Sequence, residues 1–106
     1  MNNIPELIQA AFQAAREATA SHIHAHGQNP FGCGFAWATI RPARGPLIAA
    51  LKAQGIGRKG YEAGWQVWNP SGYPTQDMEA KIAGAHAFAR VLRGAGFDVE
   101  VGSRLD

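Results

Sequence analysis

The sequence predicts a small α/β or α+β domain, in which a three-stranded sheet carries helices mainly on one face. Three segments show helical periodicity, at residues 4–24, 46–54 and 76–93. Three others show the alternation of strands, at residues 34–41, 65–69 and 97–104. The predicted order is therefore α-β-α-β-α-β. We expect a single domain over residues 1–106, made of an N-terminal helix within 1–27 and an α/β body at 33–106.

Composition and charge describe a globular chain without a strong preference for nucleic acid. Hydrophobic residues make up 46% and charged residues 17% of the 106 residues. The formal net charge is only +2 and no basic stripe is present, so nucleic acid is an improbable partner. No signal peptide or membrane-spanning run is present, and Cys33 is the single cysteine. These features predict a cytoplasmic protein without a disulfide or a membrane contact.

The N-terminal helix has clear start and stop signals. Asn3 and Glu6 have the spacing of a capping box, and Pro5 suits the first turn because its missing N–H has no partner there. Gly27 is a natural residue to end the helix.

The first strand, at residues 34–41, alternates between small and large side chains. One face carries Phe35, Trp37 and Thr39, and the other carries Gly34, Ala36, Ala38 and Ile40. A face of small residues allows a helix to approach closely, while the opposite face presents bulky rings. Pro42 ends the strand because it cannot donate a ladder hydrogen bond.

The second half of the chain contains two further predicted strands and a long helix. In the strand at 65–69, Trp65 and Val67 share one face, and Gln66 and Trp68 share the other. The preceding segment at 56–64 is too rich in glycine to predict a regular element. The long helix at 76–93 and a final strand at 97–104 complete the chain.

An anion site is expected where the strands end. Helices that separate strands favour at least partly parallel pairing, and the carboxyl ends of parallel strands share one edge. The polar residues that follow the three strands are Arg41, Arg44, Asn69, Ser71 and Arg104. Arginines from two loops can hold a phosphate or carboxylate. In the alternative interpretation they are solvated, or they pair with acids such as Glu79 and Asp98.

Aromatic residues predict a contact surface on the sheet. Two or three helices cover only one face well, so Phe35, Trp37 and either Trp65 or Trp68 are expected on an incompletely covered face, which a second copy of the chain would cover as a homodimer. The predicted residues for protein contact or base stacking are Trp37, Arg58, Lys59, Tyr61, Trp65, Trp68 and Tyr73. Protein contact is favoured, because alternation separates the two later tryptophans and prevents a joint stacking platform.

Catalytic and metal-binding signatures are weak. His22 and His26 are one helical turn apart with Cys33 following, but they do not complete a closed metal site. Cys33 has no neighbouring base fixed by a motif, and no phosphate loop or nucleophile elbow is present. The sequence therefore predicts a protein that is not an enzyme and that requires no cofactor or metal.

Three segments resemble a family of short uncharacterised proteins encoded by bacteriophages and prophages: "GFAWATIRPARGP", "GRKGYEAGWQVWNPSGYPTQDMEAK" and "AFARVLRGAGFDVEVGSRLD". The resemblance covers about residues 33–106. It implies a phage accessory protein in an infected bacterium but supplies no catalytic residue. With the features above, it leads to the expectation of a binding protein that inhibits a host defence factor. The alternative is a protein that sequesters a small anionic nucleotide.

Overall fold

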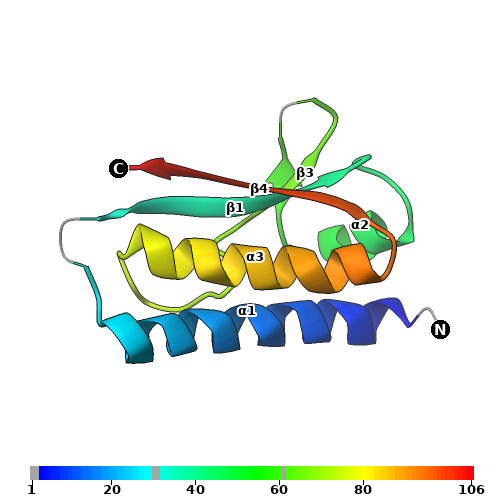
Figure 1. Ribbon diagram of the computed structural model, residues 1–106. Helices are drawn as coiled ribbons and strands as arrows, with labels where there is room; N and C mark the ends of the chain where they lie inside the picture. The colour runs from blue at the N-terminus through cyan, green and yellow to red at the C-terminus, as the bar shows by residue number, and fades with distance from the viewer. Residues whose placement is uncertain (1–2, 30–31, 61) are drawn as a thin grey trace.

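A computed structural model describes residues 3–29, 32–60 and 62–106 of the chain. The elements in order are α1 (Ile4–His26), β1 (Gly34–Arg41), α2 (Pro46–Ala53), β2 (Arg58–Lys59), β3 (Trp65–Trp68), α3 (Met78–Gly94) and β4 (Asp98–Leu105). They form a mixed α+β fold with a four-stranded sheet in the order β2-β3-β1-β4 (Figure 1). The expectation of three strands was wrong, because the glycine-rich segment contributes the two-residue strand β2.

All pairs of neighbouring strands are antiparallel, so the expectation of parallel pairing was also wrong. β1 pairs antiparallel with both β3 and β4, and β2 pairs antiparallel with β3. β3 and β4 therefore run in the same direction, but β1 lies between them. The helix α3 connects these two separated strands as in a split β-α-β unit. The helical spacing in the sequence implied a crossover connection between two strands. It did not indicate that another strand, β1, would lie between those two strands.

The predicted capping signals act as expected at both ends of α1. The Asn3 side chain accepts a hydrogen bond from the Glu6 backbone N–H at 3.1 Å, which satisfies one donor of the first turn. At the other end, Gly27 adopts a φ of 71°, a left-handed conformation that glycine reaches without steric cost.

The helices pack on one side of the sheet. Figure 1 shows α3 directly beneath the sheet and α1 beneath α3. The small residues of β1 point toward α3, and Ala36 and Ala38 are 1% and 0% exposed. The core contains residues from α1, the sheet, α2 and α3: Ile8, Ala11, Ala15, Ala38, Ile40, Leu47, Ile48, Leu51, Val67, Phe88, Ala89, Leu92 and Val99. Helices on one face therefore agree with the sequence prediction.

The opposite face of the sheet, here called the outer face, has no helix over it in the described part of the chain (Figure 1). The strand register identifies its residues, because directly paired residues share a face. Trp37 is opposite Trp68 and Gly102, Phe35 is opposite Arg104, and Gln66 is opposite Arg58. Within the described residues, no helix has the length and apolarity needed to cross a bilayer.

Candidate functional site

Three aromatic rings gather on the outer face. The Trp37 and Trp68 rings stack with centroids 4.6 Å apart, and the Phe35 ring meets Trp68 edge-on at 5.9 Å. All three side chains are half-buried, because the rings cover one another. The structure confirms that Phe35, Trp37 and one later tryptophan share the incompletely covered face, and it identifies that tryptophan as Trp68.

Two arginines lie over this aromatic cluster. The guanidinium carbon of Arg58 is 4.7 Å from the Trp68 ring centroid, and that of Arg104 is 5.9 Å from Trp68 and 5.5 Å from Phe35. Each cation is attracted to the electron-rich faces of the rings. The side chain of neither arginine makes an ion pair or a hydrogen bond with another described residue. We call Phe35, Trp37, Trp68, Arg58 and Arg104 together the aromatic–arginine patch.

The patch borders a shallow hollow that is lined in part by positively charged residues. The hollow has a volume of about 500 Å³ and is lined by Arg58, Lys59, Gly60, Gln66, Trp68 and Arg104. Lys59 and Arg58 come from the edge strand β2, and Arg104 comes from the far edge strand β4. The Trp68 indole N–H donates to the Gln66 side chain at 3.0 Å, which fixes the ring in the floor. Because Lys59 pairs with Trp65, its side chain is on the helix side, and the hollow combines an aromatic floor with the two cations Arg58 and Arg104.

A glycine allows the cluster to pack this closely to the sheet. A Cβ at Gly102 would lie 2.6–2.7 Å from three atoms of the Trp37 indole, closer than carbon atoms can approach. Trp37 therefore covers β4 at the one position where no side chain projects from the outer face.

The structure does not bring together the residues predicted for the anion site. Arg41 and Arg104 were expected at one edge, but β1 and β4 are antiparallel, and Arg104 is opposite Phe35. Arg41 is therefore six positions along β1 from the residue opposite Arg104, which is about 20 Å along the strand. Arg44 is exposed in the loop after β1, at the same end as Arg41. The predicted cluster was wrong because its premise of parallel strands was wrong.

Arg41 has carboxylate partners, in contrast to the two arginines of the patch. Its guanidinium donates to Glu100 at 2.8 Å and lies 3.6 Å from Glu62. The hydrogen bond to Glu100 is the main reason why the pKa of Arg41 is raised above its ordinary value. Arg41 therefore pairs with acids, as the alternative interpretation held, but its partners are Glu100 and Glu62 rather than Glu79 or Asp98.

Asn69 and Ser71 have structural roles in the turn that leads to α3. The Ser71 hydroxyl donates to the Asn69 side chain at 2.9 Å and accepts from the Tyr73 N–H at 3.1 Å. Ser71 is 1% exposed, and Asn69 adopts a left-handed φ of 44°. These hydrogen bonds shape the backbone of the turn. Tyr73 lies in the same turn and outside the patch.

The other predicted contact residues divide between the two faces. Trp65 is on the helix side of the sheet, packed against the core, and its indole N–H donates to the Ile56 carbonyl at 3.0 Å. It is therefore not part of the patch, as alternation with Trp68 predicted. Tyr61 lies outside the described residues. The sequence placed Phe35 on the incompletely covered face but left it out of the predicted contact residues, and it assigned Arg104 to the anion site. The strand register brings both residues beside Trp68.

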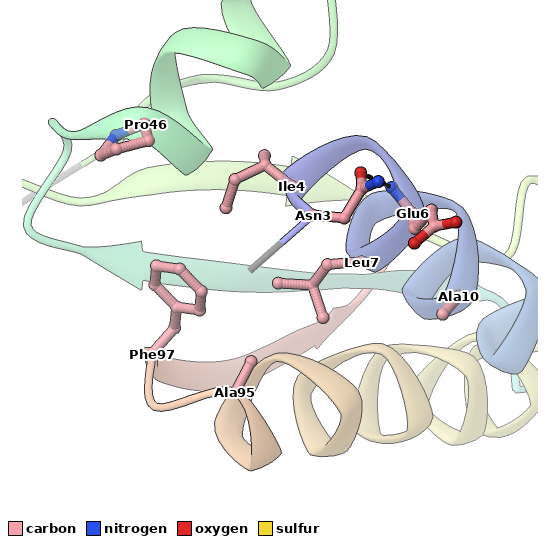
Figure 2. A pocket seen from close by; sticks show the side chains of 8 residues that line it. All are labelled: Asn3, Ile4, Glu6, Leu7, Ala10, Pro46, Ala95 and Phe97. Carbon is pink, nitrogen blue, oxygen red and sulfur yellow. Dashed lines mark hydrogen bonds between the residues drawn. The ribbon is translucent and has the colours of Figure 1, made fainter. Parts of the chain in front are cut away.

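A second hollow is apolar and lies on the helix side. It has a volume of about 530 Å³ and is bounded by the start of α1, the start of α2 and the segment after α3. In Figure 2, Ile4, Leu7 and Phe97 point toward its centre. Its polar residues are Asn3, which caps α1, and Glu6. No described cation borders it, so the aromatic–arginine patch is the stronger candidate for a site.

Two histidines near the end of α1 lie close together. The rings of His22 and His26 lie 4.7 Å apart. Among the described residues, no group of three or more histidine, cysteine, aspartate or glutamate side chains is placed to hold a metal ion. Comparison of the chain with protein-family models, curated proteins and solved structures finds no match. The case for a function therefore depends on the geometry of the patch.

Proposed function

We propose that this chain is a non-enzymatic binding protein that holds an acidic surface of a protein partner against its aromatic–arginine patch. The observation that carries the proposal is the position of Arg58 and Arg104, over one aromatic cluster and without a described carboxylate partner. Their N–H groups can donate to carboxylates of a partner. The patch itself consists of rings and guanidinium groups, which favour binding over proton transfer or nucleophilic attack.

Stacking on the rings makes these arginines suitable for recognition. An arginine that is held against an indole loses less side-chain entropy when a partner binds than one that moves freely in water. Tryptophan and arginine are also the residues most enriched among those that dominate binding energy at protein interfaces. The patch places both types together on a face that no described helix covers.

The resemblance to phage-encoded proteins supports a host protein as the partner. A phage accessory protein acts in the cytoplasm of the infected bacterium, and a host defence factor is a partner of the proposed kind. Blocking such a factor requires only an occluding contact, for which a rigid sheet face is sufficient. Because each chain has one patch, we expect one partner molecule per chain. The complex should weaken as salt is added, because salt screens the attraction between the arginines and the acidic partner.

Substitution of the two arginines tests this proposal. With the full chain as bait, we expect a bacterial lysate to yield one protein that binds reversibly to purified bait. Arg58→Ala and Arg104→Ala should each weaken the affinity by about 10-fold, since each removes one anchor of the interface. Biolayer interferometry with the purified partner provides the measurement.

The matched control is Arg90→Ala, which removes an exposed arginine from α3 on the other side of the sheet. This variant should bind as the wild type does. Equal affinities for wild type, Arg58→Ala and Arg104→Ala would contradict a role for the patch.

A nucleotide is the second candidate ligand, and the lining of the hollow specifically favours it. Arg58 and Arg104 both lie over the Trp68 indole, so phosphate and a planar base have complementary groups within one hollow. We expect isothermal titration calorimetry against mono-, di- and cyclic nucleotides to show heat that Arg104→Ala reduces. Arg41→Ala should leave that heat unchanged, because Arg41 pairs with Glu100 at the other end of β1. Absence of heat at high micromolar nucleotide would eliminate this ligand class.

A further inference from the structure

The strand β4 forms an edge of the sheet, and the direction of its backbone groups can be deduced. The N–H of Asp106 donates to the Cys33 carbonyl beside β1, so the groups of even-numbered residues point toward β1. Groups of odd-numbered residues must then point away from the sheet, because antiparallel pairs alternate. In agreement, the Val99 carbonyl accepts the Arg93 guanidinium, at 2.8 Å from Nε and 2.6 Å from Nη2.

Beyond Val99, the edge is open. The outward N–H and C=O groups of Val101, Ser103 and Leu105 have no partner among the described residues. Leu105 is 66% exposed, and among the described residues it is the only large hydrophobic side chain with such exposure. Edge strands are usually protected by charge or by a covering element, and here Arg93 protects only the first outward carbonyl.

We propose that β4 pairs antiparallel with β4 of a second copy of this chain, with Ser103 opposite Ser103 at a two-fold axis. This register uses the open groups: Val101 pairs with Leu105 of the second copy, and Leu105 with its Val101. Each of these pairs exchanges two hydrogen bonds. The exposed Leu105 side chain then lies beside an apolar neighbour instead of water. The two sheets become one continuous sheet.

The side chains on the outer face are compatible with the same register. Arg104 of one copy lies opposite Gly102 of the other, and diagonally between Glu100, which attracts it, and the second Arg104, which repels it across exposed, screened positions. Glu100 and Asp106 of the second copy are opposed, which is unfavourable, but both are exposed to screening water. A register centred on Val101 would instead require the Val99 carbonyl, which Arg93 already occupies. The Ser103-centred pairing is therefore preferred.

This dimer places both aromatic–arginine patches on the same side of the joined sheet, because the two-fold axis is perpendicular to it. The inference differs from the homodimer expected from the sequence, in which the second copy covers the aromatic face. It is also independent of the proposed partner, since it depends only on the edge of β4.

A pair of substitutions at Ser103 provides the test. Sedimentation velocity of the full chain at up to about 100 µM should show a dimer, which corresponds to a dissociation constant below that level. Ser103→Pro removes the outward N–H, which an edge strand tolerates structurally, and should give a monomer. Ser103→Ala keeps the N–H and should remain dimeric. A monomeric wild type, or a Ser103→Pro variant that is folded and dimeric, would overturn the proposal.

If Ser103→Pro fails to fold, a cross-linking experiment tests the Ser103-centred pairing instead. In a Cys33→Ser background, Ser103→Cys places two cysteines opposite each other, with Cα atoms about 5.5 Å apart, within reach of a disulfide. Mild oxidation should cross-link it at low protein concentration, whereas Val101→Cys should not cross-link. Efficient cross-linking of Val101→Cys alone, or of neither variant, would refute the Ser103-centred pairing.

Discussion

Replacing Phe88 by alanine should lower the free energy of unfolding by about 4 kcal/mol, which is the largest effect that we expect from one substitution. Phe88 lies on α3, is 1% exposed, and its ring centroid is 4.9 Å from that of Phe12 on α1. Alanine would leave a cavity between the two helices and the sheet. Domains of this size have a total stability of about 5–15 kcal/mol, so the variant should unfold at much lower urea.

Urea denaturation followed by far-UV circular dichroism measures this loss. Ile82→Ala provides the control, because Ile82 is on the same helix but only half-buried and outside the core cluster. Its loss should be smaller, about 1 kcal/mol, since part of its side chain is already exposed to water and it lies outside the core cluster. Similar losses for the two variants would show that Phe88 does not hold α1 and α3 together.

Much of the helical structure could be predicted from the sequence, because its signals are local. The Asn3 cap and the Gly27 terminus depend only on neighbouring residues, and both occur as expected. α3 was expected at residues 76–93 and is found at Met78–Gly94, with Asp77 rather than an earlier residue as its cap. The difference arises because Asp77 accepts hydrogen bonds from the Glu79 and Asn29 N–H groups. Asn29 is distant in sequence and gives no local signal.

Sheet topology could not be predicted in the same way. Whether β1 and β3 run parallel depends on where α2 returns the chain, and the sequence of the connection at 42–64 does not determine this. The strand β2 has only two residues, both exposed, so it lacks an alternating pattern. Long-range pairing decides its presence, through the contacts of Arg58 with Gln66 and of Lys59 with Trp65.

The candidate site could also be predicted only in part from the sequence. Alternation alone placed Phe35 and Trp37 on one face of β1 and separated Trp65 from Trp68. Register was needed to bring Trp68 beside Trp37 and Arg104 beside Phe35. A change of register by one residue would place Arg104 on the helix side. The face on which the aromatic residues lie could therefore be predicted from the sequence. The position of the two arginines beside them follows from pairing between distant strands.

Replacing Gly84 by valine should lower the free energy of unfolding by about 3 kcal/mol, the second largest effect that we expect. Gly84 lies where α3 crosses α1. A Cβ there would overlap the Thr19 hydroxyl and lie 3.0 Å from the Ser71 Cβ and 3.1 Å from the Ala15 carbonyl oxygen. The backbone of α1 cannot yield without breaking its own hydrogen bonds. Thermal and urea denaturation should both show the loss.

Gly94→Val is the matched control, because Gly94 is in the same helix and a Cβ there meets no atom within 4 Å. This control should be neutral or slightly stabilising, since valine forms helix better than glycine. If both variants lost the same stability, the loss would not depend on the contacts at Gly84, and the tight crossing would be refuted.

A double-mutant cycle can then identify the contact responsible. Gly84→Ala should be destabilising in the native background although alanine favours helix, because its methyl group meets the Thr19 hydroxyl. Thr19→Ala removes that hydroxyl, along with its 2.7 Å hydrogen bond to the Ala80 carbonyl. The double variant should therefore be more stable than the two single losses predict, by about 1 kcal/mol or more. Additive losses would mean that the Ser71 and Ala15 contacts, rather than Thr19, limit the space at Gly84.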